Sequence, residues 1–351
     1  MPVYITGCIL TLITTNVFHR IKHKKDTELR DVLIAFLSSF PLIYIASIRY
    51  DVGQDYLTYV QLFKRIAAGI NTYPVELLYL WMNEAIGILG GDYPWVFAIS
   101  AVIFMVCTFL SIKRDSPYYC FSAFLLVSTG FYFIFFNGMR QMLACAILLW
   151  ALRFVEERKL IPFLISVLIA SGFHTASVLF IPVYFLMNRK LNLKVICGIA
   201  ITAFALSGPL SNLIMRLISS SKYSYYIGGR FDRESSGYIT LMINIAVFVF
   251  TTFFYDKDDE QYRLYFNIQA IALCLSAFVG QVVLIHRIRW MYGFPAIILI
   301  PKALEKIPEK KTRLFAKCAI VVLYAIYFYI TIGINNSNNV LPYDTIFNHG
   351  F

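Results

Sequence analysis

Long apolar runs are the feature of this sequence that most limits what the chain can fold into. Runs of roughly 15 to 20 residues recur along its whole length, each near the number that crosses a hydrocarbon core of about 30 Å as a helix. Because lipid offers no hydrogen-bond partner to an open backbone, such runs span a membrane only as helices or closed barrels. They are continuous and do not alternate with polar residues, which favours helices. The sequence therefore predicts an all-α, polytopic membrane protein.

The composition excludes a soluble globular enzyme. Apolar residues make up 59% of the 351 residues and charged residues 15%, against about 25% charged residues in a soluble domain. The mean hydropathy is +0.67. The net charge of +11 comes from Lys and Arg in short loops, which is typical of membrane topology and does not indicate nucleic-acid binding. The seven cysteines lie almost entirely in apolar stretches without a CxxC pair, which favours packing residues.

Twelve candidate spans can be placed on the sequence. They are 3–18, 31–48, 94–112, 118–136, 139–153, 160–172, 174–187, 193–210, 238–255, 264–284, 290–304 and 314–333. No basic segment precedes residues 3–18 and no small-residue cleavage site follows them, so we expect a retained span and no signal peptide. We expect a single transmembrane domain over residues 1–351, without repeats or a soluble domain.

The basic loops predict which side of the membrane each connection occupies. Lys and Arg cluster in loops that we assign to the cytoplasm, namely 19–30, 113–116, 153–159, 188–194, 256–263 and 305–313. Both termini then lie outside, and the largest outer segments are 49–93 and 211–237. Residues 49–74 are expected outside and 113–116 inside, so an odd number of crossings must lie between them. The span 94–112 already supplies one, and a second crossing by the apolar stretch 75–89 would make the number even. We therefore expect that stretch to be an interfacial or re-entrant outer helix.

The cations assigned to the outer side are mostly arginines. Of the 31 Lys and Arg residues, the cytoplasmic side holds 8 Arg and 13 Lys, whereas the outer side holds 8 Arg and only 2 Lys. Topology alone needs positive charge, but a planar guanidinium is suited to forked hydrogen bonds with phosphate or carboxylate. The bias favours an anionic ligand at the outer face over chance and interfacial snorkelling.

Four outer elements carry unusual residues at one membrane boundary. The first is Arg49-Tyr50-Asp51-Val52-Gly53-Gln54-Asp55-Tyr56, with Tyr59 one helical turn beyond Asp55; a solvated loop would explain this element equally well. The second is Asn137-Gly138-Met139-Arg140-Gln141, in which Arg140 falls in the first turn of a helix. The charge of Arg140 opposes the helix dipole there, and an anionic partner would compensate it.

The other two elements contain histidines. His174 lies at the tip of the short hairpin between 160–172 and 174–187, where a structural and a functional histidine are equally good interpretations. The last element is His286-Arg287-Ile288-Arg289-Trp290-Met291-Tyr292, in which Arg289 shares a helix face with His286 and with Tyr292. Core packing does not predict that four distant segments reach one depth on one face. We interpret them as parts of a common site.

Motifs for cofactor chemistry are absent from the sequence. We find no metal-ligand spacing, nucleotide-binding loop or hydrolase motif, so we expect no cofactor and no metal. Most of the aromatic residues belong to the core and to interfacial belts. A minority, such as Tyr223, Tyr225 and Tyr226 in an outer loop, could stack on sugar rings.

Five short motifs along the chain are similar to those of one family. RYDVGQDYLTYVQLF resembles the loop R-x-x-V-G-T-D-Y-x-x-Y, with Gln54 where Thr is usual. FYFIFFNGMRQMLACAI resembles N-x-x-R-Q, and ASGFHTASVLFIPVYF resembles F-H-x-S-A, with Thr175 among the departures. KYSYY at 222–226 resembles K/R-Y-x-x-Y, and RWMYGF at 289–294 resembles R-x-x-Y-F. In order and spacing these motifs resemble the EpsG-like family of Wzy-type polysaccharide polymerases over most of the chain.

The resemblance implies a membrane glycosyltransferase with a GT-C-like helical architecture. Such enzymes work at the outer face of the bacterial inner membrane and move a glycan from a polyprenyl diphosphate carrier onto a carrier-linked repeat unit. We expect the diphosphate to be held by Arg140 and Arg289, helped by Arg49 and Arg287, and the base to be His174 or Asp55. Glycan contacts are expected from Asp51, Gln54, Tyr56, Tyr59, Glu76, Asn137, Gln141, Tyr223, Tyr226, His286 and Tyr292.

Two other functions stay open at this point. A ligase of the same chemistry would transfer the glycan to a different acceptor, and the sequence hardly separates it from a polymerase. A lipid-linked oligosaccharide flippase would carry charges along a midplane cavity, whereas here they gather at the outer edge. The expected partners are polyprenyl-diphosphate-linked oligosaccharides and the lipid bilayer, with a flippase and a chain-length regulator as further candidates. Nucleic acid is not expected.

Overall fold

The part of the chain that the computed structural model describes comprises residues 1–19, 27–70, 74–186, 193–219, 237–256, 258–279, 281–282 and 285–350. Its regular elements are helices, and its one β contact is an isolated bridge between Arg49 and Thr345. The all-α fold class is therefore confirmed. The chain divides into two compact units, one of residues 1–153, 161–178 and 307–351, the other of residues 154–160 and 179–306.

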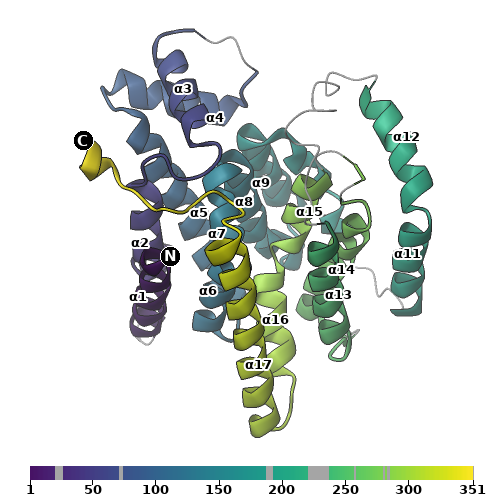
Figure 1. The fold of residues 1–351 in the computed structure, drawn as a ribbon. Coiled ribbons are helices and arrows are strands. Elements are labelled where there is room, and N and C mark those ends of the chain that lie inside the picture. The colour runs from purple at the N-terminus through teal and green to yellow at the C-terminus, as the bar shows by residue number, and fades with distance from the viewer. Residues whose placement is uncertain are drawn as a thin grey trace. The chain divides into compact units, whose positions relative to one another are not determined.

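The first unit is built around α2, which packs against both α1 and α5 (Figure 1). Small residues on α2, among them Ala35, Ser38 and Ala46, are fully buried and allow this close packing. The helix begins where the Thr27 side chain accepts a hydrogen bond from the N–H of Arg30. The helices of this unit are α1 (Pro2–His19), α2 (Glu28–Ser47), α3 (Tyr56–Ala67), α4 (Leu77–Ile88), α5 (Tyr93–Asp115), α6 (Tyr119–Ser128), α7 (Phe131–Asn137), α8 (Met139–Glu156), α9 (Leu160–Phe173) and α17 (Lys310–Phe328).

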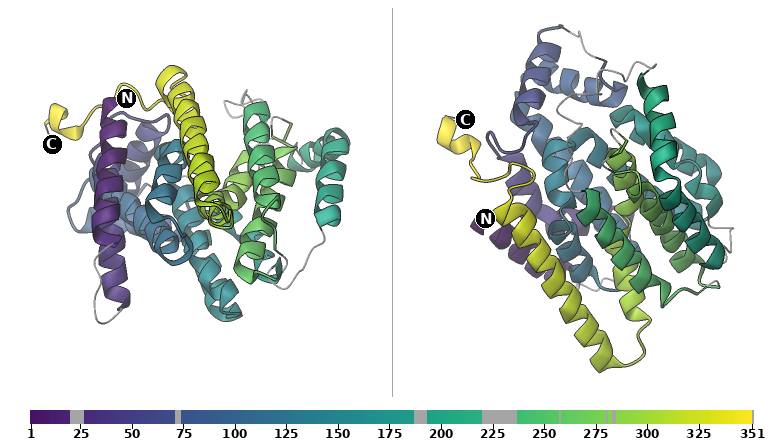
Figure 2. Two further views of the ribbon diagram at one scale, coloured as in Figure 1. Left: turned by 90° about the horizontal axis from the view of Figure 1, so that it is seen from below. Right: turned by 45° about the vertical axis from the view of Figure 1, so that its right-hand side comes forward.

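The C-terminal segment, residues 335–350, belongs to the same unit and runs back to the N-terminal helices. It follows a π-helical stretch, Tyr329–Ile334, that extends α17. Tyr4 Oη donates to the carbonyl of Val340 (2.8 Å), and the N–H of Ile346 donates to the carbonyl of Ile48 (2.9 Å). Figures 1 and 2 show this segment in yellow, running from the end of α17 past the N-terminus. It therefore covers the end of α2, where the first predicted site loop begins.

The second unit is organised around α14, which contacts α11, α13, α15 and α16. Polar residues are buried along α14: Gln269 Nε2 donates to Asn244 Oδ1 on α13 (3.1 Å), and Asn267 Nδ2 donates to the carbonyl of Leu186 (3.1 Å). The helices of this unit are α10 (Val183–Leu186), α11 (Leu193–Ala205), α12 (Ser207–Ser219), α13 (Gly237–Thr252), α14 (Glu260–Ser276), α15 (Ile285–Gly293) and α16 (Ala296–Glu305).

Three helices in the described residues are long and apolar enough to cross a membrane: Glu28–Ser47, Tyr93–Asp115 and Lys310–Ile334. Two bent pairs raise the number to five if each pair is one span: Tyr119–Ser128 with Phe131–Asn137, bent by 49°, and Leu193–Ala205 with Ser207–Leu217, bent by 67°. A membrane protein is thus supported, while the count of twelve crossings stays a prediction.

Several predicted spans are broken or differ in extent. The run 118–136 is interrupted between α6 and α7, where Gly130 has a φ of +90° that favours glycine. The run 290–304 is divided between α15 and α16 on either side of Phe294 and Pro295. Residues 49–74 were expected to be an outer segment and contain a helix, α3. The expected helix at 75–89 is present as α4, and its position in the membrane interface stays a prediction.

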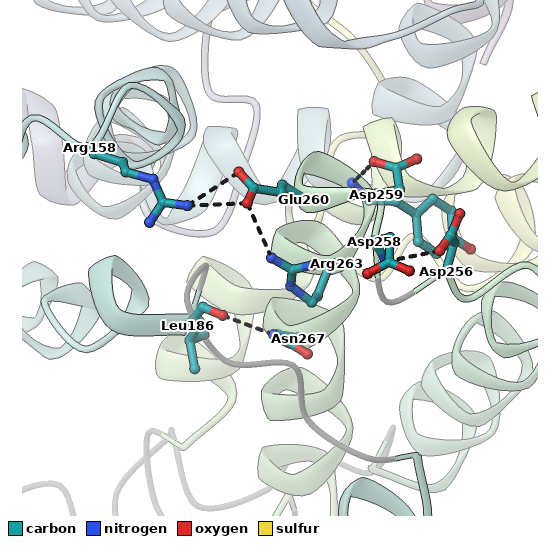
Figure 3. Close-up of polar contacts among 9 residues, drawn as sticks. Arg158, Leu186, Asp256, Asp258, Asp259, Glu260, Arg263 and Asn267 are labelled. Carbon is teal, nitrogen blue, oxygen red and sulfur yellow. Dashed lines mark hydrogen bonds and ion pairs between the residues drawn. The ribbon is translucent and has the colours of Figure 1, made fainter.

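Charged side chains join loops that the sequence assigns to one side of the membrane. In the second unit, Arg158 Nη2 lies 3.2 Å from Glu260 Oε1, and Arg263 Nη2 lies 3.8 Å from the same oxygen (Figure 3). Lys306 Nζ lies 2.7 Å from Asp259 Oδ2. These pairs join the predicted cytoplasmic loops 153–159, 256–263 and 305–313. Their meeting agrees with a shared side, and the choice of the cytoplasm rests on their positive charge.

Candidate functional site

The loop that follows α2, residues 48–55, is held in place by the buried side chain of Arg49. This side chain is 0% exposed, and its Nη1 donates to the carbonyl oxygens of Val52 (3.0 Å) and Phe136 (2.9 Å). The guanidinium carbon lies 4.6 Å from the ring centroid of Phe97. Burial lowers the pKa of Arg49 to about 10, so the side chain stays charged at neutral pH. Arg49, predicted as a diphosphate ligand, instead lies beneath the loop and fixes it to α7.

Asn137, at the end of α7, joins this loop to the C-terminal segment. Its Oδ1 accepts a hydrogen bond from the N–H of Gln54 (2.8 Å), and its Nδ2 donates to the carbonyl of Asn338 (3.1 Å). Gly53 permits the close approach, because its φ is +103° and a Cβ atom on it would lie 2.9 Å from Asn137 Oδ1. The predicted glycan contacts Asn137 and Gln54 are therefore neighbours, and Gln54 is exposed.

Tyr59, on α3, fixes the start of α8. Its Oη donates to the carbonyl of Asn137 (2.7 Å) and accepts from the N–H of Met139 (3.0 Å), so one phenol bridges the break between α7 and α8. Tyr56 and Tyr59 are 2% and 7% exposed, and Gln141 is 3% exposed. The sequence predicts all three as glycan contacts. The structure places them in the core: Tyr56 and Tyr59 lie on the inward face of α3, and Gln141 is buried in the first turn of α8.

Glu76, directly before α4, contacts two predicted site residues from distant elements. Its Oε2 forms an ion pair with Nη1 of Arg140, in the first turn of α8. Its Oε1 lies 3.4 Å from Nδ1 of His174, directly after α9. The side chains of Glu76, Arg140 and His174 are 15%, 32% and 16% exposed, so the group is partly shielded from water. These three residues are called the Glu76 cluster below.

The charges of the Glu76 cluster compensate one another. Burial of the Glu76 carboxyl would raise its pKa, but the hydrogen bond with His174 and the charge of Arg140 outweigh burial and lower the pKa to about 2. The carboxylate is therefore ionised at neutral pH. Arg140 also lies 5.7 Å from the ring centroid of Tyr79. The anionic partner expected for a cation in the first turn of a helix is thus supplied by the chain itself.

Close packing of α4 on α9 brings the Glu76 cluster together. A Cβ atom on Gly172 would lie 2.5 Å from Cγ of Leu78, so only glycine fits here without a shift. At the end of α9, the N–H of His174 donates to the carbonyl of Ala170 (2.9 Å), and its own carbonyl accepts from the N–H of Ser177 (3.0 Å). His174 is therefore fixed where the α-helix changes into a 3₁₀ turn, Thr175–Phe180.

The two loop carboxylates were candidates for a base and for a glycan contact. Asp51 is exposed and has a φ of +49°, and Asp55 lies half-buried directly before α3. Within the described ranges, no group of three or more His, Cys, Asp or Glu side chains could hold a metal ion. Independence from metal and cofactor stays a prediction. Tyr223 and Tyr226, the other expected glycan contacts, lie outside the described residues.

The remaining predicted outer element lies on α15 in the second unit. His286 is buried, and burial together with the charges of Arg287 and Arg289 lowers the pKa of His286 to about 3. Both arginines are half-buried. Tyr292 is buried and its Oη donates to the carbonyl of Leu179. Binding of the diphosphate by these arginines, and glycan contacts by His286 and Tyr292, stay predictions.

The asparagine-rich stretch after α17 is a part of the site that the sequence motifs do not include. Asn336 Oδ1 accepts from the N–H groups of Val340 (2.8 Å) and Leu341 (3.0 Å), which shapes a turn. The carbonyl of Asn339 accepts from the N–H of Gly53 (2.9 Å). The run INNSNN directly follows the last predicted span, on the predicted outer side. This position is the signal that could have identified it.

Comparison with known proteins gives a family match. The model of the EpsG family matches residues 32–345, which is most of the chain. The comparisons with curated proteins and with solved structures found no match. The matched range contains the loop after α2, the Glu76 cluster and α15. The resemblance of the five motifs to this family is thereby confirmed.

Proposed function

The chain belongs to the EpsG family, and on that premise we propose that it polymerises polyprenyl-diphosphate-linked oligosaccharide repeat units at the outer face of the bacterial inner membrane. The family indicates a membrane protein of polysaccharide biosynthesis. The carrier-linked donor, the twelve crossings in a GT-C-like arrangement and the outward position of the site belong to the proposal. So do a flippase and a chain-length regulator as partners.

The Glu76 cluster is the observation that supports this function most. Glycan transfer from a diphosphate carrier needs a cation for the leaving group and a proton acceptor for the attacking hydroxyl. Arg140 is 32% exposed and has a guanidinium that can fork onto phosphate oxygens. His174 turns Nδ1 toward Glu76, which directs Nε2 away from that carboxylate. The two chemical needs are thus met by side chains that share one partner.

The proposed transfer is a displacement at the anomeric carbon of the donor glycan. The acceptor hydroxyl gives its proton to His174 Nε2, and its oxygen forms the new glycosidic bond. The bond between the anomeric carbon and the diphosphate breaks, and its electron pair stays on the diphosphate. Arg140 stabilises the negative charge that develops there. Asp55 is the alternative base.

A polymerase can be distinguished from the two other functions by its product. We expect purified protein in lipid vesicles to lengthen carrier-linked repeat units presented only on the side of the site. Chain length is measured by gel electrophoresis of the labelled glycan. A flippase would leave the chain length unchanged, and a ligase would transfer glycan only when a different acceptor is added.

Arg140 is tested in the same assay by replacing it with lysine. Lysine keeps the charge but cannot form forked hydrogen bonds, so we expect Arg140→Lys to lose nearly as much activity as Arg140→Ala. Arg65→Lys is the matched control, because Arg65 is exposed on α3 and has no assigned role. Full activity in Arg140→Lys would show that the residue acts as a point charge only.

A further inference from the structure

Glu76 is the residue that links the two halves of the proposed chemistry. We propose that Glu76 is a positioning residue for transfer, which orients His174 toward the acceptor and Arg140 toward the leaving diphosphate through its two carboxylate oxygens. This inference rests on the proposed function. It replaces the glycan contact that the sequence predicts for Glu76.

The contact with His174 determines which ring nitrogen can accept a proton. An ionised carboxylate can only accept hydrogen bonds, so Nδ1, 3.4 Å from Glu76 Oε1, carries the ring proton. The lone pair of a neutral imidazole then lies on Nε2. In the part of the chain that the structure describes, the side chain of His174 has no other polar partner. Glu76 therefore sets the tautomer that a base needs.

The contact with Arg140 uses only one side of the guanidinium. Nη1 of Arg140 donates a hydrogen bond to Oε2 of Glu76, and an arginine has five N–H donors in all. Among the described residues no other hydrogen bond of Arg140 is present, so the rest of the fork can meet a ligand. Since Glu76 holds the guanidinium at Nη1, it favours orientations in which the opposite edge points toward a ligand.

The balance of charge gives Glu76 a role before and during transfer. Before transfer, the negative charge of Glu76 is offset by Arg140, while Nε2 of His174 holds the lone pair that accepts the proton. When His174 accepts the proton from the hydroxyl, the imidazolium lies beside the same carboxylate and is stabilised by it. As the bond to the diphosphate breaks, negative charge develops on the diphosphate. Arg140 then stabilises that charge. One carboxylate thus serves both cations in succession.

The test compares Glu76→Gln, directly before α4, with Glu84→Gln, the same substitution at an exposed position within α4. We expect Glu76→Gln to lower kcat by about 10²-fold or more, because the amide no longer holds the base in its tautomer. The KM for the carrier-linked donor should not rise, since Arg140 stays charged and loses a competing anion. Glu76→Asp, which keeps the charge at a shorter reach, should recover part of kcat. Glu84→Gln should match the unmodified protein.

A double-substitution cycle separates positioning from simple structural support. Because Glu76 acts on the base through His174, Glu76→Gln should cause a smaller loss of kcat in a His174→Ala background than in the unmodified protein, and the loss that remains is the part that acts through Arg140. Additive losses, equal losses of donor affinity and kcat, or a fall in unfolding temperature that accounts for both would overturn the inference. If the unmodified protein elongates glycans and Glu76→Gln behaves like Glu84→Gln, only this inference fails. If the unmodified protein does not elongate them, the polymerase proposal itself fails.

Discussion

Gly172 is the residue on which the packing of α4 against α9 depends most directly. Because a Cβ atom there would lie 2.5 Å from Leu78 Cγ, we expect Gly172→Ala to push the two helices apart and to separate Glu76 from His174. Transfer activity should fall while the protein stays folded. Activity and unfolding temperature measured in detergent check this expectation.

A compensating substitution makes the explanation specific. Leu78→Ala removes Cγ and Cδ1, which a Cβ on Gly172 would meet at 2.5 and 2.7 Å, and leaves only Leu78 Cβ, at 3.1 Å. The double variant Gly172→Ala with Leu78→Ala should therefore regain part of the activity that Gly172→Ala loses. Gly198→Ala is the control, because a Cβ atom there would meet nothing within 4 Å. If the double variant is no more active than Gly172→Ala, the clash is not the cause.

The ion pair of Glu76 predicts a pH dependence of stability. Its pKa is lowered from 4.5 to about 2 in the folded chain, so the pair stabilises the fold fully above pH 4.5. That contribution is lost as the pH falls toward 2, because the unfolded chain then binds a proton that the folded chain does not. Unfolding temperatures across this range should fall less steeply in Glu76→Gln than in Glu84→Gln. Equal slopes would mean that the pair contributes nothing to stability.

At the residue scale, the sequence identified the ionisable side chains that are energetically unfavourable at the membrane boundary, but not the residues that they pair with. Arg140 and His174 stood out because ionisable groups are costly at a membrane boundary. Glu76 was only one of several expected glycan contacts, since its position depends on the packing of α4 on α9, which no local pattern encodes. The sequence predicts Tyr59 as a glycan contact, because a tyrosine near an outer loop can either stack on a sugar ring or pack in the core. Its hydrogen bond to Asn137 became visible only in three dimensions.

At the element scale, the C-terminal segment predicts what truncation will do. Removing residues 336–351 leaves α17 intact but deletes the hydrogen bonds from Gly53 to Asn339 and from Asn137 to Asn338. We expect faster hydrogen exchange in residues 50–54 and a lower rate of transfer, measured by mass spectrometry and by the elongation assay. Removing only residues 350–351 is the control. Unchanged exchange in the loop would contradict the role given to this segment.

The elements differ in how far the sequence could predict them. A continuous apolar run predicts a helix, but it does not tell where that helix breaks, because every position in it is apolar. Gly130 inside 118–136 was an available sign of a break, since its positive φ is what glycine permits. The helix α3 was also readable, since Tyr56, Tyr59 and Phe63 recur at helical spacing on one buried face.

At the scale of the whole molecule, the sidedness of the loops can be tested by labelling. We expect a membrane-impermeant thiol reagent to modify Lys64→Cys from outside intact cells and to spare Asp258→Cys, in a background without the seven natural cysteines. Both positions are exposed in the structure. Permeabilised cells, in which both should react, control for reactivity. The reverse pattern would invert the topology and move the Glu76 cluster to the cytoplasmic face.

The hydrogen bond from Tyr4 to Val340 joins residues 336 positions apart, and this separation orders events during biosynthesis. Residues 49–54 leave the ribosome long before Asn339, so the nascent loop at first lacks the backbone carbonyl that accepts a hydrogen bond from the N–H of Gly53. The apolar helices that precede the asparagine-rich stretch can enter the bilayer one after another, since each forms its backbone hydrogen bonds internally. The loop after α2 can form its hydrogen bond with the C-terminal segment only after α17 has been inserted. The chain therefore acquires its apolar framework early and completes the loop after α2 late, once translation has passed the asparagine-rich stretch.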